Sequence, residues 1–89
     1  MAVLIVTYDL RKEISKADYE GFYGVIKTYP WARLSESSYA IDTILTPEHI
    51  FNALYPYLDA NDHVEVITLT SPYWGRNTPE VMKWLQDRL

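Results

Sequence analysis

The residue best placed for chemistry is Asp9, which follows the apolar run Ala2 to Tyr8. The run is apolar at both alternating sets of positions, a pattern that predicts a central strand covered on two sides. Functional groups of open sheets gather at the carboxyl ends of such strands, and a carboxylate there could ligate a hard cation such as magnesium. A strand-end aspartate more commonly accepts hydrogen bonds from turn amides. Both interpretations of Asp9 stand on the sequence.

A metal site at Asp9 would need a further ligand, because one carboxylate is too few to hold a cation firmly. A symmetric dimer with Asp9 near its two-fold axis would give one magnesium ion two carboxylate ligands. Asp42 is expected on a later strand, with its side chain on the sheet face that carries no helices. It could add to an acidic site there or simply face solvent.

Other reactive residue types lack partners in the sequence. His49 and His63 are isolated and fall in different elements. Ser35, Ser37 and Ser38 cluster beside Glu36 without the glycines of a nucleophile elbow, so they are interpreted as turn residues. No phosphate-binding loop, dinucleotide fingerprint or metalloprotease motif occurs.

Two adjacent aromatic residues, Tyr73 and Trp74, fall in a loop that contains Pro72 and Gly75. Exposed aromatic side chains can stack on a base or anchor a partner protein. Packing back over the edge of the core is the commoner role of such a pair, and we expect it here.

The basic residues available to hold a phosphate are Arg11, Lys12 and Arg33. The formal net charge of the chain is −4, which opposes non-specific binding to nucleic acid. A nucleic-acid role would therefore require these residues to converge through the fold, and otherwise they are solvated surface charges.

Length and composition predict one small globular domain spanning residues 1–89. The chain has 89 residues, of which 48% are apolar and 15% aromatic, enough for one packed core. It has no cysteine, so no disulfide or thiolate site can form. The N-terminal apolar run is too short for a signal peptide or a membrane span, and we expect a cytoplasmic protein.

Seven elements are expected from periodicity and from helix-start signals. The strands are Ala2 to Tyr8, Trp31 to Leu34, Tyr39 to Ile44 and Val64 to Thr70, and the helices run from Ser15 to about Thr28, from Thr46 to about Leu58 and from Thr78 to Leu89. Pro56 should distort the end of the second helix. Gly21 and Gly24 should allow the first helix to approach the sheet closely.

This order predicts an α+β fold, a ferredoxin-like βαββαβ sandwich with an added C-terminal helix. The first and third strands should be central, with two helices on one face of the sheet. Because the first and fourth strands are apolar on both faces, something must cover the other face. The last helix could cover it, and so could a second subunit, which predicts a homodimer.

Several residues resemble a known group of proteins. They are Tyr8 and Asp9 at the end of the first strand, Ser38 and Tyr39 opening a strand after a hairpin turn, and Asp62 just before the last core strand. Together they resemble the small CRISPR-associated adaptation nucleases and their VapD-like toxin relatives. The similarity is greatest to small SinR-like proteins of that group. It rests on two sets of residues, which are Leu34, Ser35, Ser38, Tyr39, Ile41 and Thr43, and then Trp74, Gly75, Val81, Trp84 and Leu85.

The resemblance implies a ferredoxin-like homodimer whose sheets meet on their helix-free faces, with Asp9 beside the two-fold axis as a magnesium ligand. The implied activity is magnesium-dependent cleavage of nucleic acid, with RNA as the first substrate to test. Where those nucleases carry an arginine-rich stretch after the aspartate, this chain has only Arg11 and Lys12. The alternative is a non-catalytic dimeric interaction or regulatory module, such as a phage- or plasmid-linked accessory protein. A small-ligand sensor on the same fold is a third reading, without a glycine-rich or basic ligand loop to support it.

Overall fold

The computed structural model describes residues 2–10 and 19–89, and in these residues the chain forms a four-stranded antiparallel sheet with three α-helices. Four strands form the sheet: β1 (Ala2–Asp9), β2 (Trp31–Ser35), β3 (Ser38–Thr43) and β4 (His63–Leu69). The helices are α1 (Glu20–Ile26), α2 (Pro47–Leu54) and α3 (Pro79–Arg88). The strand order across the sheet is β2-β3-β1-β4, so β1 is central as expected.

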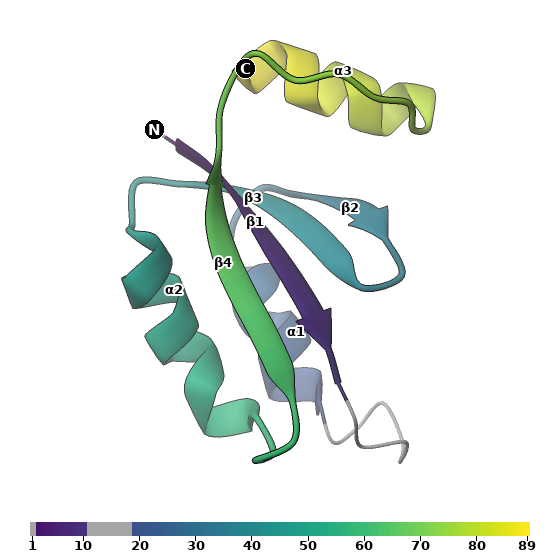
Figure 1. Ribbon diagram of the computed structural model, residues 1–89. Helices are drawn as coiled ribbons and strands as arrows, with labels where there is room; N and C mark the ends of the chain where they lie inside the picture. Colours follow the sequence, from purple (N-terminus) through teal and green to yellow (C-terminus); the bar gives the residue numbers. More distant parts are fainter. Residues whose placement is uncertain (1, 11–18) are drawn as a thin grey trace.

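One face of the sheet carries α1 and α2 and the larger part of the core. Leu4, Val6 and Tyr8 of β1 point to this face, where they meet Phe22 and Ile26 of α1 in one buried cluster. Ile50 and Leu54 of α2 belong to the same cluster. Figure 1 shows both helices on this side of the sheet.

The other face is covered at one end by α3, which lies apart from α1 and α2 near the start of β1 (Figure 1). Val81 and Leu85 of α3 pack on Val3 and Ala40 in a second, smaller cluster. Of the two coverings expected from the sequence, the last helix therefore provides one. It covers only part of the face, because Ile67 of β4 remains 52% exposed.

The helix starts agree with local sequence signals where the structure describes them. The side chains of Thr46 and Thr78 accept hydrogen bonds from the backbone N–H groups of His49 and Val81, with a proline in the first turn of each helix. The expected helix cap Ser15 lies outside the described residues.

Two helices end earlier than expected. α1 ends at Ile26 rather than near Thr28, and the hydroxyl of Thr28 donates to the carbonyl of Gly24. α2 ends at Leu54, after which a 3₁₀ turn, η2, spans Tyr55–Tyr57 and contains Pro56. A proline cannot donate the α-helical hydrogen bond, so the change to a tighter turn at Pro56 agrees with the expected distortion.

Two packing expectations are corrected. The expected close approach of α1 to the sheet through its glycines is instead an approach of Gly21 to the Tyr57 ring of η2, and a Cβ atom built at Gly24 would meet nothing within 4 Å. Asp42 does lie on the face opposite α1 and α2, but it is buried rather than exposed to solvent, because Arg88 of α3 binds it.

No helix in the described part of the chain is both long and apolar enough to cross a membrane.

Candidate functional site

Asp9 is exposed at the end of β1 and faces the side of the sheet that α1 and α2 leave free. Side chains alternate along a strand, so Leu4, Val6 and Tyr8 face the helices, whereas Ile5, Thr7 and Asp9 face the other way. In the antiparallel register with β4, Asp9 lies opposite His63. The strand register therefore places the candidate metal ligand, Asp9, opposite His63, a histidine for which the sequence indicates no catalytic partner.

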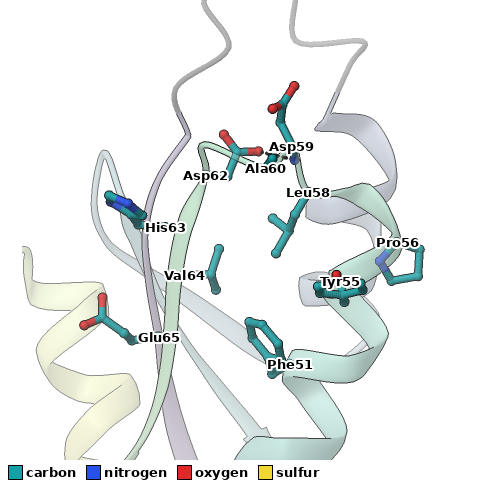
Figure 2. A pocket seen from close by; sticks show the side chains of 10 residues that line it. All are labelled: Phe51, Tyr55, Pro56, Leu58, Asp59, Ala60, Asp62, His63, Val64 and Glu65. Carbon is teal, nitrogen blue, oxygen red and sulfur yellow. Dashed lines mark hydrogen bonds between the residues drawn. The ribbon is translucent and has the colours of Figure 1, made fainter.

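Among the residues that the structure describes, no helix covers the rest of this face, a continuous set of cross-strand pairs that we call the open strip. It consists of Ile5, Thr7 and Asp9 on β1 and of Ile67, Glu65 and His63 directly opposite them on β4. Figure 2 shows His63 and Glu65 on one side of β4 and Val64 on the other, toward Phe51 and Leu58. The open strip thus joins an apolar end, at Ile5 and Ile67, to a charged end.

The candidate phosphate-binding residue Arg33 lies on the opposite face of the sheet from Asp9. Arg33 pairs with Tyr39 in the β2–β3 register, and Tyr39 pairs with Val6, whose side chain lies in the core beneath the helices. Within one chain the structure thus separates Arg33 from Asp9. Arg11 and Lys12 lie outside the described residues.

Arg33 instead belongs to a hollow of about 580 Å³ beside α1, which we call the tyrosine hollow. Its lining consists of Glu20, Tyr23, Gly24 and Lys27 from α1 and its C-cap, and of Arg33 and Tyr39 from the hairpin. The Arg33 guanidinium lies 5.9 Å from the centroid of the Tyr39 ring. The Lys27 ammonium lies 5.1 Å from the centroid of the neighbouring Trp31 ring.

Tyr8 is buried next to Tyr23 and Tyr39, two of the residues that line this hollow. Its ring packs edge-to-face on Phe22 and on Tyr23, at centroid distances of 5.1 and 6.0 Å, and stacks near Tyr39. Its hydroxyl donates to the carbonyl of Glu36 at 3.3 Å. Burial, above all, and then the neighbouring Tyr23 phenol raise the pKa of Tyr8 above its usual range, so its phenol stays protonated at neutral pH.

A second, larger hollow of about 930 Å³ lies between β4 and the α2–η2 segment (Figure 2). Asp62, one of the residues in the family resemblance, borders it. Its carboxylate accepts a hydrogen bond from the backbone N–H of Asp59 at 2.7 Å and from the Tyr19 hydroxyl at 3.1 Å. These bonds tie the loop before β4 to the start of α1, so Asp62 is engaged in holding the loop.

The buried carboxylate of Asp42 is paired with Arg88 at the C-terminal end of α3. The Arg88 Nε donates to Asp42 at 3.0 Å, and the Asp42 side chain is only 7% exposed. The guanidinium also lies 4.1 Å from the centroid of the Trp84 ring. Asp42 therefore anchors α3 to the sheet and does not join Asp9 in an acidic site.

The remaining candidates are separate from one another. The His49 ring bonds the Thr46 hydroxyl at 2.8 Å, at the start of α2. The Ser35 and Ser38 hydroxyls bond each other at 2.6 Å in the hairpin, as expected of turn residues. Tyr73 packs against the cluster under α3, which agrees with the expected packing role, whereas Trp74 is fully exposed. Among residues 2–10 and 19–89, no three potential ligands from His, Cys, Asp and Glu come together.

Reasoning from the sequence missed Lys27, Tyr23 and the pairing of Asp9 with His63. Lys27 and Tyr23 are spaced at i and i+4 on a helix, which places them on one face, and this signal could have been used. The position of that face over Arg33 and Tyr39 depends on how α1 packs on the hairpin. The pairing of Asp9 with His63 depends on the sheet register.

Comparison with known proteins finds no family model, no curated protein and no solved structure that matches this chain.

Proposed function

We propose that this chain is a ferredoxin-like protein of the group formed by the small CRISPR-associated adaptation nucleases and the VapD-like proteins. The β-α-β-β-α-β order supports the fold assignment, as does an antiparallel sheet with the first and third strands in its centre. The group assignment rests on the resemblance through Tyr8, Asp9, Ser38, Tyr39 and Asp62. The positions of the other four residues in the structure suit a structural role, whereas Asp9 is exposed at the end of β1.

Within this group, we infer that the chain functions as a homodimeric binding module that self-associates through the open strip. The observation that carries the inference is the exposure of Ile67 on a sheet face, beside Ile5, where α3 does not reach. Apolar side chains that adjoin on an uncovered sheet face mark an interaction surface.

A second copy of the chain is the occupant that suits the strip. A two-fold contact places each residue against a reciprocal partner, so Ile5 and Ile67 of one copy can cover the same residues of the other. His63 of one copy can then approach Glu65 or Asp9 of the other, which gives the charged end a complementary contact. The second copy would also cover the part of this sheet face that α3 leaves exposed.

The test of the dimer compares two isoleucines. Ile67→Lys puts a charge in the open strip, whereas Ile44→Lys puts the same charge on the loop before α2, where the side chain is 80% exposed. Sedimentation or light scattering at tens of micromolar protein should give a dimer for the parent and for Ile44→Lys and a monomer for Ile67→Lys. A monomeric parent, or equal effects of the two substitutions, would refute contact through the strip.

A magnesium-dependent ribonuclease is the second candidate, and the position of Asp9 favours it. The carboxylate is exposed at the end of the strip, where a two-fold axis could bring two copies to one cation. Two close carboxylates repel each other unless a divalent cation lies between them. Such a cation would activate water and stabilise charge on a phosphodiester. Since Arg33 faces the other side, Arg11 and Lys12 are the residues proposed to hold the phosphate.

Cleavage assays separate the two candidates. Asp9→Asn removes the charge but keeps the shape, so it should abolish magnesium-dependent RNA cleavage and leave the dimer intact. Asp87→Asn, on an exposed turn of α3, is the matched control and should cleave as the parent does. If Asp9→Asn cleaves RNA at the parent rate, Asp9 is not the metal ligand. If none of the proteins cleaves RNA or DNA with magnesium or manganese, the binding module remains.

A further inference from the structure

The tyrosine hollow lies on the helix-covered side of the sheet, at its β2 edge, away from the open strip. It is bordered by two exposed cationic side chains, Lys27 and Arg33. Both are held over aromatic rings, Lys27 over Trp31 and Arg33 over Tyr39. Trp31 and Tyr39 themselves contact each other edge-to-face at a centroid distance of 5.6 Å, so the two cations lie over two adjoining rings.

Arg33 is held in position by the hairpin. Its Nε donates to the Ser35 carbonyl at 3.2 Å and its Nη2 donates to the Glu36 carbonyl at 3.4 Å. These bonds hold the guanidinium near the ring of Tyr39 and leave further N–H groups available for a ligand. A pre-positioned arginine loses less side-chain entropy on binding than a free one.

We propose that the tyrosine hollow binds a nucleotide unit, a base with its attached phosphate. Lys27 and Arg33 bind the phosphate, and the base stacks on the half-buried Tyr23 ring. Single-stranded nucleic acid is bound through this combination of cationic and aromatic side chains. The unit belongs either to a free nucleotide or to a single-stranded RNA.

Size and local charge both favour this ligand. A volume of about 580 Å³ lies in the range of small-molecule pockets. Two cations and one carboxylate, Glu20, line the hollow, so it is locally positive although the chain has a net charge of −4. A local positive site with aromatic walls selects an anion that also carries a ring, and it disfavours duplex nucleic acid, whose bases are stacked.

Calorimetry with defined probes tests the site. AMP, adenosine and ribose 5-phosphate are titrated into the full chain at low salt. AMP should bind at least about tenfold more tightly than either adenosine or ribose 5-phosphate, since only AMP uses both the rings and the cations. No detectable binding of AMP at millimolar concentration, or equal binding of ribose 5-phosphate, would overturn the proposal.

Matched variants locate the binding. Arg33→Gln and Lys27→Gln should each weaken AMP binding about tenfold, whereas Arg76→Gln, which removes an exposed arginine from the loop before α3, should leave it unchanged. Circular dichroism checks that all three fold. If Arg76→Gln weakens AMP as much as Arg33→Gln does, the binding is non-specific and the site assignment is wrong.

A short single-stranded oligoadenylate separates the two sources of the ligand. Tighter binding of the oligomer than of AMP, lost in Arg33→Gln, supports the site and identifies RNA. Binding no tighter than that of AMP supports it and identifies a free nucleotide. The result is independent of the dimer, because Ile67→Lys leaves the hollow intact and should bind AMP as the parent does.

Discussion

At the scale of single residues, Gly21 of α1 occupies a position that has no room for a side chain. The Tyr57 ring of η2 packs so closely over Gly21 that a Cβ atom built there would overlap it. A Cβ atom built at Gly24, one turn later in the same helix, would meet nothing within 4 Å. The two glycines therefore differ in role although the sequence presents them as a pair.

We predict opposite effects of alanine at these two positions. Gly21→Ala should lower the free energy of unfolding by about 1–2 kcal/mol, because the Tyr57 ring must move away. Gly24→Ala should raise it by a few tenths to about 1 kcal/mol, because alanine favours the helix and meets nothing. Urea unfolding of both variants measures the difference.

A variant of Tyr57 provides the control. In a Tyr57→Ala background, the overlap is absent and Gly21→Ala should become neutral or stabilising. Equal loss of stability from Gly21→Ala with and without the Tyr57 ring would show that the contact is not the cause.

At the scale of elements, α3 depends on a few contacts from residues far apart in the sequence. The side-chain amide of Asn77 donates to the Leu34 carbonyl at 2.9 Å, just before the helix. At the other end Arg88 pairs with the buried Asp42. The apolar contact of Val81 and Leu85 with the sheet lies between these two attachments. The helix is therefore fixed at both ends and packed along one side.

We predict that Arg88→Gln destabilises the protein by about 1–3 kcal/mol, because it leaves the Asp42 carboxylate buried without its cation. Lys83→Gln is the matched control. Lys83 pairs with Asp87 at 3.1 Å on the exposed side of the same helix, where such pairs contribute at most about 0.5 kcal/mol. Chemical unfolding that gives equal losses for the two variants would contradict the anchoring role of Arg88.

At the scale of the whole molecule, the two faces of the sheet are covered to different extents. α1 and α2 cover one face, whereas α3 covers one end of the other and leaves the open strip. The tyrosine hollow and the strip lie on opposite faces. A dimer formed through the strip would leave both nucleotide sites accessible, so self-association and ligand binding are compatible.

We predict that the melting temperature of the protein rises with its concentration. Only the folded chain dimerises, so dimerisation stabilises the folded state by mass action. A hundredfold increase in protein concentration should therefore raise the melting temperature by several degrees. Scanning fluorimetry or calorimetry over that range measures the shift. The Ile67→Lys variant should melt at one temperature throughout, and a parent that does the same would contradict the dimer.

The sequence by itself determined the elements of this protein, because their signals are local. The apolar pattern of residues 2–8 is enough to predict a central strand, and β1 lies between β3 and β4. The threonine-proline starts at Thr46 and Thr78 act within one helical turn and need no tertiary contact. The distortion at Pro56 is local for the same reason.

Only the tertiary structure decided which residues share a site. Asp42 and Arg88 are 46 positions apart, and no local pattern shows that α3 would bury the carboxylate. Strand register puts His63 opposite Asp9 and places Arg33 on the other face of the sheet. A shift of one residue in the register of a strand would move its side chains to the opposite face. Packing of α1 on the hairpin places Lys27 and Arg33 around one hollow. These outcomes depend on long-range contacts, whose free energy is summed over the whole core and is not encoded at any one position.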